Sequence, residues 1–209
     1  MKKHFWKLEY SITIFILLGI FMFFVPVKFE NYFQARLISK WNDKYEKVSY
    51  MFSVINTQTT DEILKSFADA ETPEQREILL LQLIKPYMRL ETIERKPWKY
   101  RPRFLNGKKV PKKDIFYFND IYMSDGQIVG VKDIAKNEKN YAWFMLMFDI
   151  NGFLPPNTWG RDIYGLFIYD EGKVVPFGYS KDMDELKMDC SDEGTGLFCS
   201  YYYRIGGGW

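Results

Sequence analysis

The polar residues with the clearest capacity for chemistry lie close together in one segment, interrupted by glycine and proline. Asp149, Asn151, Asn157 and Asp162 supply carboxylate and amide oxygens of mixed charge. Such oxygens suit Ca²⁺, whereas Zn²⁺ would require histidine or cysteine ligands. The segment is not an EF-hand, because the later ligands and the terminal glutamate of that loop are missing. Two interpretations stay open: a calcium site of modest affinity, or a hydrogen-bonded corner in which these side chains bond the backbone.

The cysteines offer a second, simpler chemistry. Cys190 and Cys199 are the only two in the chain. In a domain outside the cytoplasm they should form one disulfide that closes a small loop. A metal pair is disfavoured, because the spacing is not C-x-x-C and the only histidine, His4, lies at the other end of the chain. With one histidine and no nucleophile–base pair, we expect no enzymatic activity.

A basic stretch at residues 95–113 carries many cations and no acid, and aromatic residues are interleaved with them. Cations beside rings that can stack are what single-stranded nucleic acid or an anionic polysaccharide would meet. The other interpretation is a solvated connection broken by proline. The residues expected to contact a polyanion are Arg95, Lys96, Trp98, Lys99, Tyr100, Arg101 and Arg103.

The N-terminal part of the chain must position everything that follows. From Tyr10 to Val27 the sequence is uncharged and almost wholly apolar. About 18 residues of helix extend roughly 27 Å, close to the hydrocarbon core of a bilayer. No small-residue cleavage site follows, so we expect a permanent anchor in the lipid bilayer. Lysines at positions 2, 3 and 7 precede the span, which predicts a cytoplasmic N-terminus and a C-terminal domain outside the cytoplasm.

Beyond Pro26 the pattern predicts that the same helix continues to about residue 57. Pro26 should bend this helix rather than end it. One face carries an apolar stripe at steps of three and four residues. Its members are Leu37, Trp41, Tyr45, Val48, Phe52 and Ile55. A single helix cannot bury such a stripe alone, so we expect a sheet to cover it.

The rest of the chain supplies that sheet. Thr72, Pro73 and Gln75 have the types and spacing of a helix start, and the helix should end near Leu90. Period-two and apolar runs then predict four or five antiparallel strands, the first two joined by a tight turn at 124–126. The runs are 115–123, 127–134, 141–150, 163–169 and 174–176. The fold class is therefore α+β. The 209 residues suit one domain plus an anchor, and the net charge of +2 points to no global electrostatic partner.

The N-terminus resembles that of type IV pilins and of type II secretion pseudopilins. In those proteins a short basic leader and a glycine precede a phenylalanine, a glutamate four residues later and an apolar helix. Phe5 and Glu9 match this spacing, and Pro26 stands where pilins often have a kinking proline. His4 departs from the pattern, because the prepilin peptidase expects glycine there. The segment 149–162 and the C-terminal part that contains the two cysteines also resemble such proteins.

The resemblance implies a pilin-like fold with three parts. They are a leader and transmembrane helix at 1–28, its amphipathic continuation at 29–58 and an extracytoplasmic globular domain at 59–209. It further implies a minor pilin or pseudopilin in the bacterial inner membrane, a structural subunit of a type IV pilus or type II secretion machine. The implied partners are other pilin-like subunits, an assembly platform and a prepilin peptidase.

An alternative interpretation starts from the basic stretch. A membrane-tethered module could bind DNA or an anionic wall polymer through residues 95–113. Salt-dependent binding would separate this hypothesis from a purely structural subunit.

Overall fold

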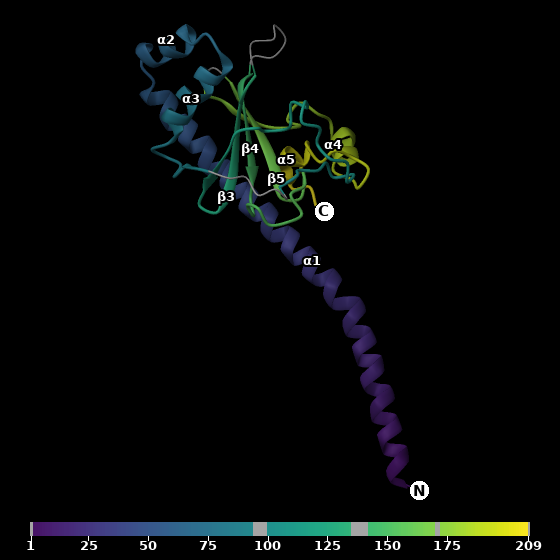
Figure 1. Ribbon diagram of the computed structural model, residues 1–209. Coiled ribbons are helices and arrows are strands. Elements are labelled where there is room, and N and C mark those ends of the chain that lie inside the picture. Colours follow the sequence, from purple (N-terminus) through teal and green to yellow (C-terminus); the bar gives the residue numbers. More distant parts are fainter. Residues whose placement is uncertain (1, 94–99, 135–141, 170–171, 209) are drawn as a thin grey trace. The chain divides into compact units, whose positions relative to one another are not determined.

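The computed structural model describes residues 2–93, 100–134, 142–169 and 172–208 (Figure 1). Within these ranges the side chains of residues 2–9, 21, 23–31, 62–65 and 142 are outside the description. The chain divides into two compact units, Met1–Arg36 and Leu37–Gly208, and each is described by itself.

Helix α1, Lys2–Gln58, is 57 residues long. It continues through Pro26 and ends close to the predicted end at residue 57. Proline removes one backbone hydrogen bond, and the i→i−4 bonds on either side can continue the helix.

The prediction of a membrane span is wrong. In the part of the chain that the structure describes, no helix combines the length and the apolar character that crossing a bilayer requires. The transmembrane first half of the helix and the single-pass placement in an inner membrane are therefore not supported. Within the apolar run the side chains described are those of residues 10–20 and 22, fewer than the about 17–25 consecutive residues that a spanning helix requires.

The sheet has six strands, all antiparallel, in the order of the sequence. They are β1 (Glu91–Thr92), β2 (Ile121–Ser124), β3 (Gln127–Asp133), β4 (Ala142–Asp149), β5 (Ile163–Tyr169) and β6 (Val174–Pro176). The prediction of a pilin-like fold with four or five strands is thus also wrong in strand number. The missed strand, β1, has only two residues, and such a short strand shows no period in the sequence.

The turn between β2 and β3 is the predicted one. Asp125 and Gly126 both have positive φ angles, 50° and 78°, as a two-residue hairpin turn requires. The register follows from it, with Ser124 opposite Gln127 and Ile121 opposite Gly130.

Both faces of the sheet are buried. On one face the predicted stripe of α1 packs against apolar residues of β3, β4 and β5, with Trp41, Leu37 and Phe52 at most 3% exposed. The other face packs against the segments that surround the sheet, including Trp159 and Phe177. Because β4 contacts apolar side chains on both faces, its sequence is an apolar run rather than an alternation.

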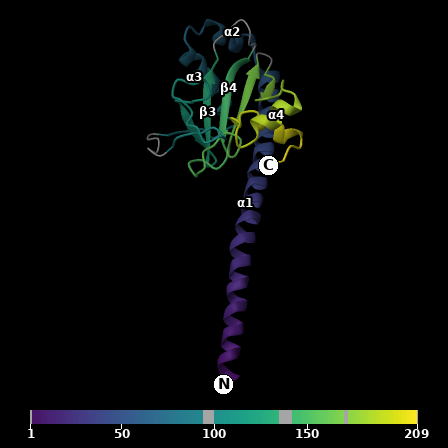
Figure 2. The same cartoon turned by 90° about the vertical axis from the view of Figure 1, so that its right-hand side faces the viewer.

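Short helices complete the fold. They are α2 (Asp61–Asp69), α3 (Pro73–Ile84), α4 (Met183–Asp189), α5 (Cys199–Tyr202) and the 3₁₀ turn η1 (Tyr203–Ile205). Within the second unit, the outer part of α1 lies along the sheet, and α2 and α3 lie near the C-terminal end of α1 (Figures 1 and 2).

Helix α3 begins as predicted but ends early. Thr72 and Gln75 form the reciprocal capping box that their spacing indicated. The helix ends at Ile84 rather than near Leu90, because Pro86 has no N–H to donate to the helix.

Candidate functional site

The acidic and amide residues of segment 149–162 form a buried corner between β4 and β5. Asp149 is the last residue of β4 and lies opposite Ile163, the first residue of β5, in the sheet register. Asp162 immediately precedes β5, and its carbonyl accepts a hydrogen bond from the Ile150 amide at 2.8 Å. Both carboxylates are fully buried, at 0% exposure.

Asp162 holds the turn that precedes it. Its Oδ2 accepts a hydrogen bond from the Asn157 amide at 2.8 Å, and its Oδ1 accepts one from the Thr158 amide at 2.6 Å. Asn157 has a positive φ of 52°, a conformation that asparagine tolerates better than most residues. Each oxygen of Asp162 is therefore engaged by the backbone.

Asn157 links the two acids. With its amide nitrogen facing Asp149, it donates to Asp149 Oδ2 at 3.0 Å and to the Gly152 carbonyl at 3.2 Å. The other polar atoms are less well satisfied. Among the described residues, Asp149 Oδ1, Asn151 Oδ1 and the Tyr100 hydroxyl are buried without a hydrogen-bond partner.

Burial sets the protonation of the corner. It raises the pKa of Asp162 to about 6, even though the amides of Thr158 and Asn157 favour the charged form. Burial, and then the nearby charge of Asp162, raise the pKa of Asp149 well above its usual range. Burial, together with the charge of Asp149, likewise raises the pKa of Tyr100.

These contacts fit a hydrogen-bonded corner better than a calcium site. Both oxygens of Asp162 accept backbone amides, and the Asn157 amide nitrogen faces Asp149. Asn151 uses its amide nitrogen on the Pro155 carbonyl at 3.2 Å. The described part of the chain contains no group of three or more histidine, cysteine or acidic side chains that could hold a metal ion. Calcium at these residues stays a prediction.

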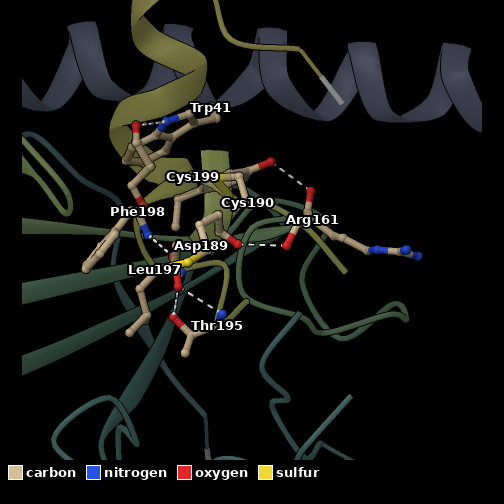
Figure 3. The surroundings of a disulfide bond; sticks show 12 residues. Trp41, Arg161, Asp189, Cys190, Thr195, Leu197, Phe198 and Cys199 are labelled. Atoms are coloured by element: carbon tan, nitrogen blue, oxygen red, sulfur yellow. Dashed lines mark hydrogen bonds between the residues drawn. A yellow bond between two sulfur atoms is a disulfide. The ribbon is translucent and has the colours of Figure 1, made fainter. Parts of the chain in front are cut away.

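The predicted disulfide between Cys190 and Cys199 is present. Figure 3 shows it beside Asp189, the last residue of α4. The Asp189 carboxylate accepts hydrogen bonds from the Thr195 amide at 2.9 Å, from the Thr195 hydroxyl and from the Phe198 amide at 2.8 Å. It thereby orders the loop that the disulfide closes.

The C-terminal helix is joined to both α1 and the sheet. Trp41 Nε1 donates to the Ser200 carbonyl at 2.9 Å (Figure 3). The hydroxyl of Ser200 accepts a hydrogen bond from the Gly165 amide of β5 at 2.9 Å. Trp41 also stacks on Tyr164, with ring centroids 4.8 Å apart. Sequence reasoning missed the roles of Asp189 and Ser200, because neither belongs to a recognisable local motif.

Several predicted site residues cannot be placed. The side chains of His4, Phe5 and Glu9, the predicted processing residues, lie outside the description. The same holds for four members of the basic stretch: Arg95, Lys96, Trp98 and Lys99. Its other members are described: Arg101 and Arg103 are exposed, whereas Tyr100 is half-buried.

A second candidate site is the N-terminal part of α1. Residues 10–18 are consecutively exposed, with Phe15 at 76% and Leu17 at 59%. Neither apolar core cluster of the chain includes them. No protein-family model, curated protein or solved structure matches this chain, so its function must be inferred from its own residues.

Proposed function

We propose that this protein is a structural subunit that assembles through the N-terminal part of α1. The observation that supports the proposal is the cluster of exposed apolar side chains within residues 10–18, namely Ile12, Ile14, Phe15, Ile16, Leu17 and Leu18. A helical turn takes about 3.6 residues, so a consecutive run of this length covers every side of the helix. A helix that is apolar all round is normally buried.

The two halves of α1 differ in how much apolar surface stays exposed for a partner to bind. The stripe from Leu37 to Ile55 is already buried by the sheet of the same chain. The described apolar residues within 10–20 and at 22 are not part of that core. Contacts between subunits are therefore expected from these residues.

The all-round apolar surface also indicates the kind of assembly. A single partner would cover one side of the helix and leave the other sides in water. Several neighbouring helices would cover all of them, so we propose a bundle of copies of this helix or of related ones. Such bundles form the interior of type IV pili and type II secretion pseudopili. The spacing of Phe5 and Glu9 resembles that in the subunits of these fibres. That resemblance also implies that, if the chain is cleaved before Phe5, Glu9 neutralises the new N-terminal amine of a neighbouring subunit, because a carboxylate in an apolar bundle needs a partner.

The test compares two lysine substitutions on the same helix in the full-length chain. Phe15 and Tyr50 are almost equally exposed, at 76% and 74%, but Tyr50 lies in the half that the sheet already covers. We expect wild type and Tyr50→Lys to form ordered fibres or oligomers, and Phe15→Lys to remain monomeric. Electron microscopy and light scattering after size-exclusion chromatography measure this. A wild-type chain that stays monomeric at about 100 µM, or two variants that behave alike, would refute the proposal.

A further inference from the structure

The described part of the basic stretch is a small hairpin with two different faces. Arg103 pairs antiparallel with Lys109 and, on its other side, parallel with Thr158. The Val110 amide donates to the Pro102 carbonyl at 3.1 Å, and the Phe104 amide donates to the Lys108 carbonyl at 2.8 Å. The hairpin is therefore held in a fixed register on the segment that leads into β5.

Buried and exposed side chains alternate along this hairpin. Pro102 and Val110 are buried, whereas their neighbours Arg101, Arg103 and Lys109 are exposed. Because successive residues of an extended strand point to opposite faces, these three cations share the outer face. Two further exposed lysines continue from it. We call this set the 101–113 basic face: Arg101, Arg103, Lys109, Lys112 and Lys113.

The charges of the 101–113 basic face are not neutralised by close contacts. Among the described residues, no ion pair joins any of its five cations to a carboxylate. The Arg103 guanidinium donates to the Gly107 carbonyl at 3.0 Å and is held across the hairpin. Asp114, which follows Lys113, has its Oδ1 engaged by the Phe116 amide at 2.9 Å.

The aromatic residues of the hairpin are directed inward. Tyr100 packs edge-to-face on Phe153, with centroids 5.5 Å apart, and its hydroxyl is buried. Phe104 packs against the core cluster that contains Trp159. Base stacking requires an exposed ring, and neither of these two rings is free for it. The described face thus offers charge without a stacking platform, unlike the single-strand site that the sequence alone suggested.

We propose that the 101–113 basic face binds a linear phosphodiester polymer through its backbone charges. Arginine matches phosphate with a planar fork of donors, and lysine adds point charges along the chain. Duplex DNA and a phosphodiester wall polymer both offer such a backbone. Recognition of either would be independent of sequence, because phosphate contacts carry no base information.

The magnitude follows from counterion release. If five cations contact five phosphates of duplex DNA, the slope of log affinity against log salt is about −4.5. Raising salt from 50 to 200 mM would then weaken binding about 500-fold. Removing three of the five cations should reduce the slope to about −1.8, which corresponds to only about a 12-fold loss over the same range.

The experiment uses the full-length chain and fluorescent duplex DNA of about 30 base pairs, in two unrelated sequences. The test variant is Arg101→Gln/Lys109→Gln/Lys112→Gln, which spares the held Arg103. The matched control is Lys85→Gln/Arg89→Gln/Lys187→Gln, which removes the same residue types from exposed positions elsewhere. We expect the steep salt slope in wild type and control, and the shallow slope in the test variant. Competition by poly(glycerol phosphate) and by polyglutamate identifies the polymer chemistry.

The outcomes are distinct. Competition by poly(glycerol phosphate) but not by polyglutamate supports recognition of phosphodiesters. Whichever of duplex DNA and poly(glycerol phosphate) binds more tightly identifies the natural polymer as DNA or as a wall polymer. No binding at 50 mM salt, an equal loss in the control variant, or equal competition by polyglutamate would overturn the proposal. Polymer binding is also measured in Phe15→Lys, in which the proposed contacts between subunits are removed. Failure of the proposed assembly can therefore be told apart from failure of polymer binding.

Discussion

The buried carboxylates of Asp149 and Asp162 should respond unequally to replacement by asparagine. Asp162 accepts two backbone amides, one on each oxygen. Asp149 accepts the Asn157 amide on Oδ2 and leaves Oδ1 buried without a partner. Replacing a carboxylate by a carboxamide changes one acceptor oxygen into an NH₂ donor. The substitution therefore disrupts one site and suits the other.

At Asp162 the new NH₂ group would face a backbone N–H. One buried amide then loses its acceptor, which costs about 1–3 kcal/mol. At Asp149 the NH₂ group can take the place of Oδ1 and donate to the hydroxyl of Tyr100, which lies beside Asp149. Both substitutions remove a buried charge, so at pH 7 we expect Asp149→Asn to raise the free energy of unfolding by more than Asp162→Asn does, because only at Asp162 does a lost acceptor for a backbone amide offset that gain.

The pH dependence gives the second part of the magnitude. The pKa of Asp162 is raised from 3.8 to about 6 in the folded protein. Between these values the folded state keeps a proton that the unfolded state has released, so stability falls as pH rises through this window. About two pKa units correspond to about 3 kcal/mol. Asp149, whose pKa is also raised, adds a loss in the same direction.

Urea denaturation from pH 4 to 7.5 measures both effects. Wild type should lose stability toward neutral pH, and Asp149→Asn should lose less. Exposed Asp120 provides the control, because Asp120→Asn should follow the wild-type curve. A drop in stability for Asp149→Asn of more than about 1 kcal/mol at pH 7 would refute this reasoning. It would mean that ionised Asp149 has a partner, and a bound cation would then be the first candidate.

Three further predictions concern the metal, the disulfide and the N-terminus. Thermal melts in millimolar CaCl₂, MgCl₂ and EDTA should coincide, whereas a calcium-specific rise abolished by Asp149→Ala would establish a metal site. Non-reducing mass mapping should find Cys190 and Cys199 linked, and replacing both by alanine should cost about 2–3 kcal/mol of unfolding free energy. Alkylation of both thiols in native protein would contradict this. N-terminal sequencing of native protein should show little cleavage between His4 and Phe5, because the leader glycine is missing, and a mature chain that starts at Phe5 would contradict it.

Features that depend on residues close together in the sequence were predictable. The stripe from Leu37 to Ile55 repeats at helical spacing, and the structure buries it as expected, with only Tyr45 half-exposed. The Asp125–Gly126 turn was identifiable because few residues adopt two consecutive positive φ angles. In both cases neighbours in sequence determine the geometry.

Features that depend on distant residues were not predictable. Tyr100 belongs to a basic stretch, and composition placed it on a binding surface. The fold instead packs it on Phe153 and leaves its hydroxyl buried near the charge of Asp149. Asp189 likewise gave no signal, because the amides of Thr195 and Phe198 that donate to it lie six and nine residues further along the chain, beyond any local motif.

The predicted membrane span shows a different limit. An uncharged run of the right length met the usual criterion at the sequence level. Helix α1 is long enough, but the side chains described within this run are those of residues 10–20 and 22, fewer than the about 17–25 that a span requires.

The segment 157–160 connects the three sites on the globular unit. The Asp162 carboxylate accepts hydrogen bonds from the amides of Asn157 and Thr158. The backbone of Arg103, in the 101–113 basic face, bonds the same segment: its carbonyl accepts the Trp159 amide at 2.9 Å, and its amide donates to the Asn157 carbonyl at 3.0 Å. A side chain at Gly160 would bring its Cβ within 2.8 Å of Cys199 Sγ. A change in the corner should therefore move the hairpin and disturb the disulfide loop. If Asp162→Asn loses polymer binding, we would attribute the loss to this coupling and not to a direct contact of Asp162 with the polymer. If Arg101→Gln/Lys109→Gln/Lys112→Gln loses binding while its stability is unchanged, the loss would come from the 101–113 basic face itself.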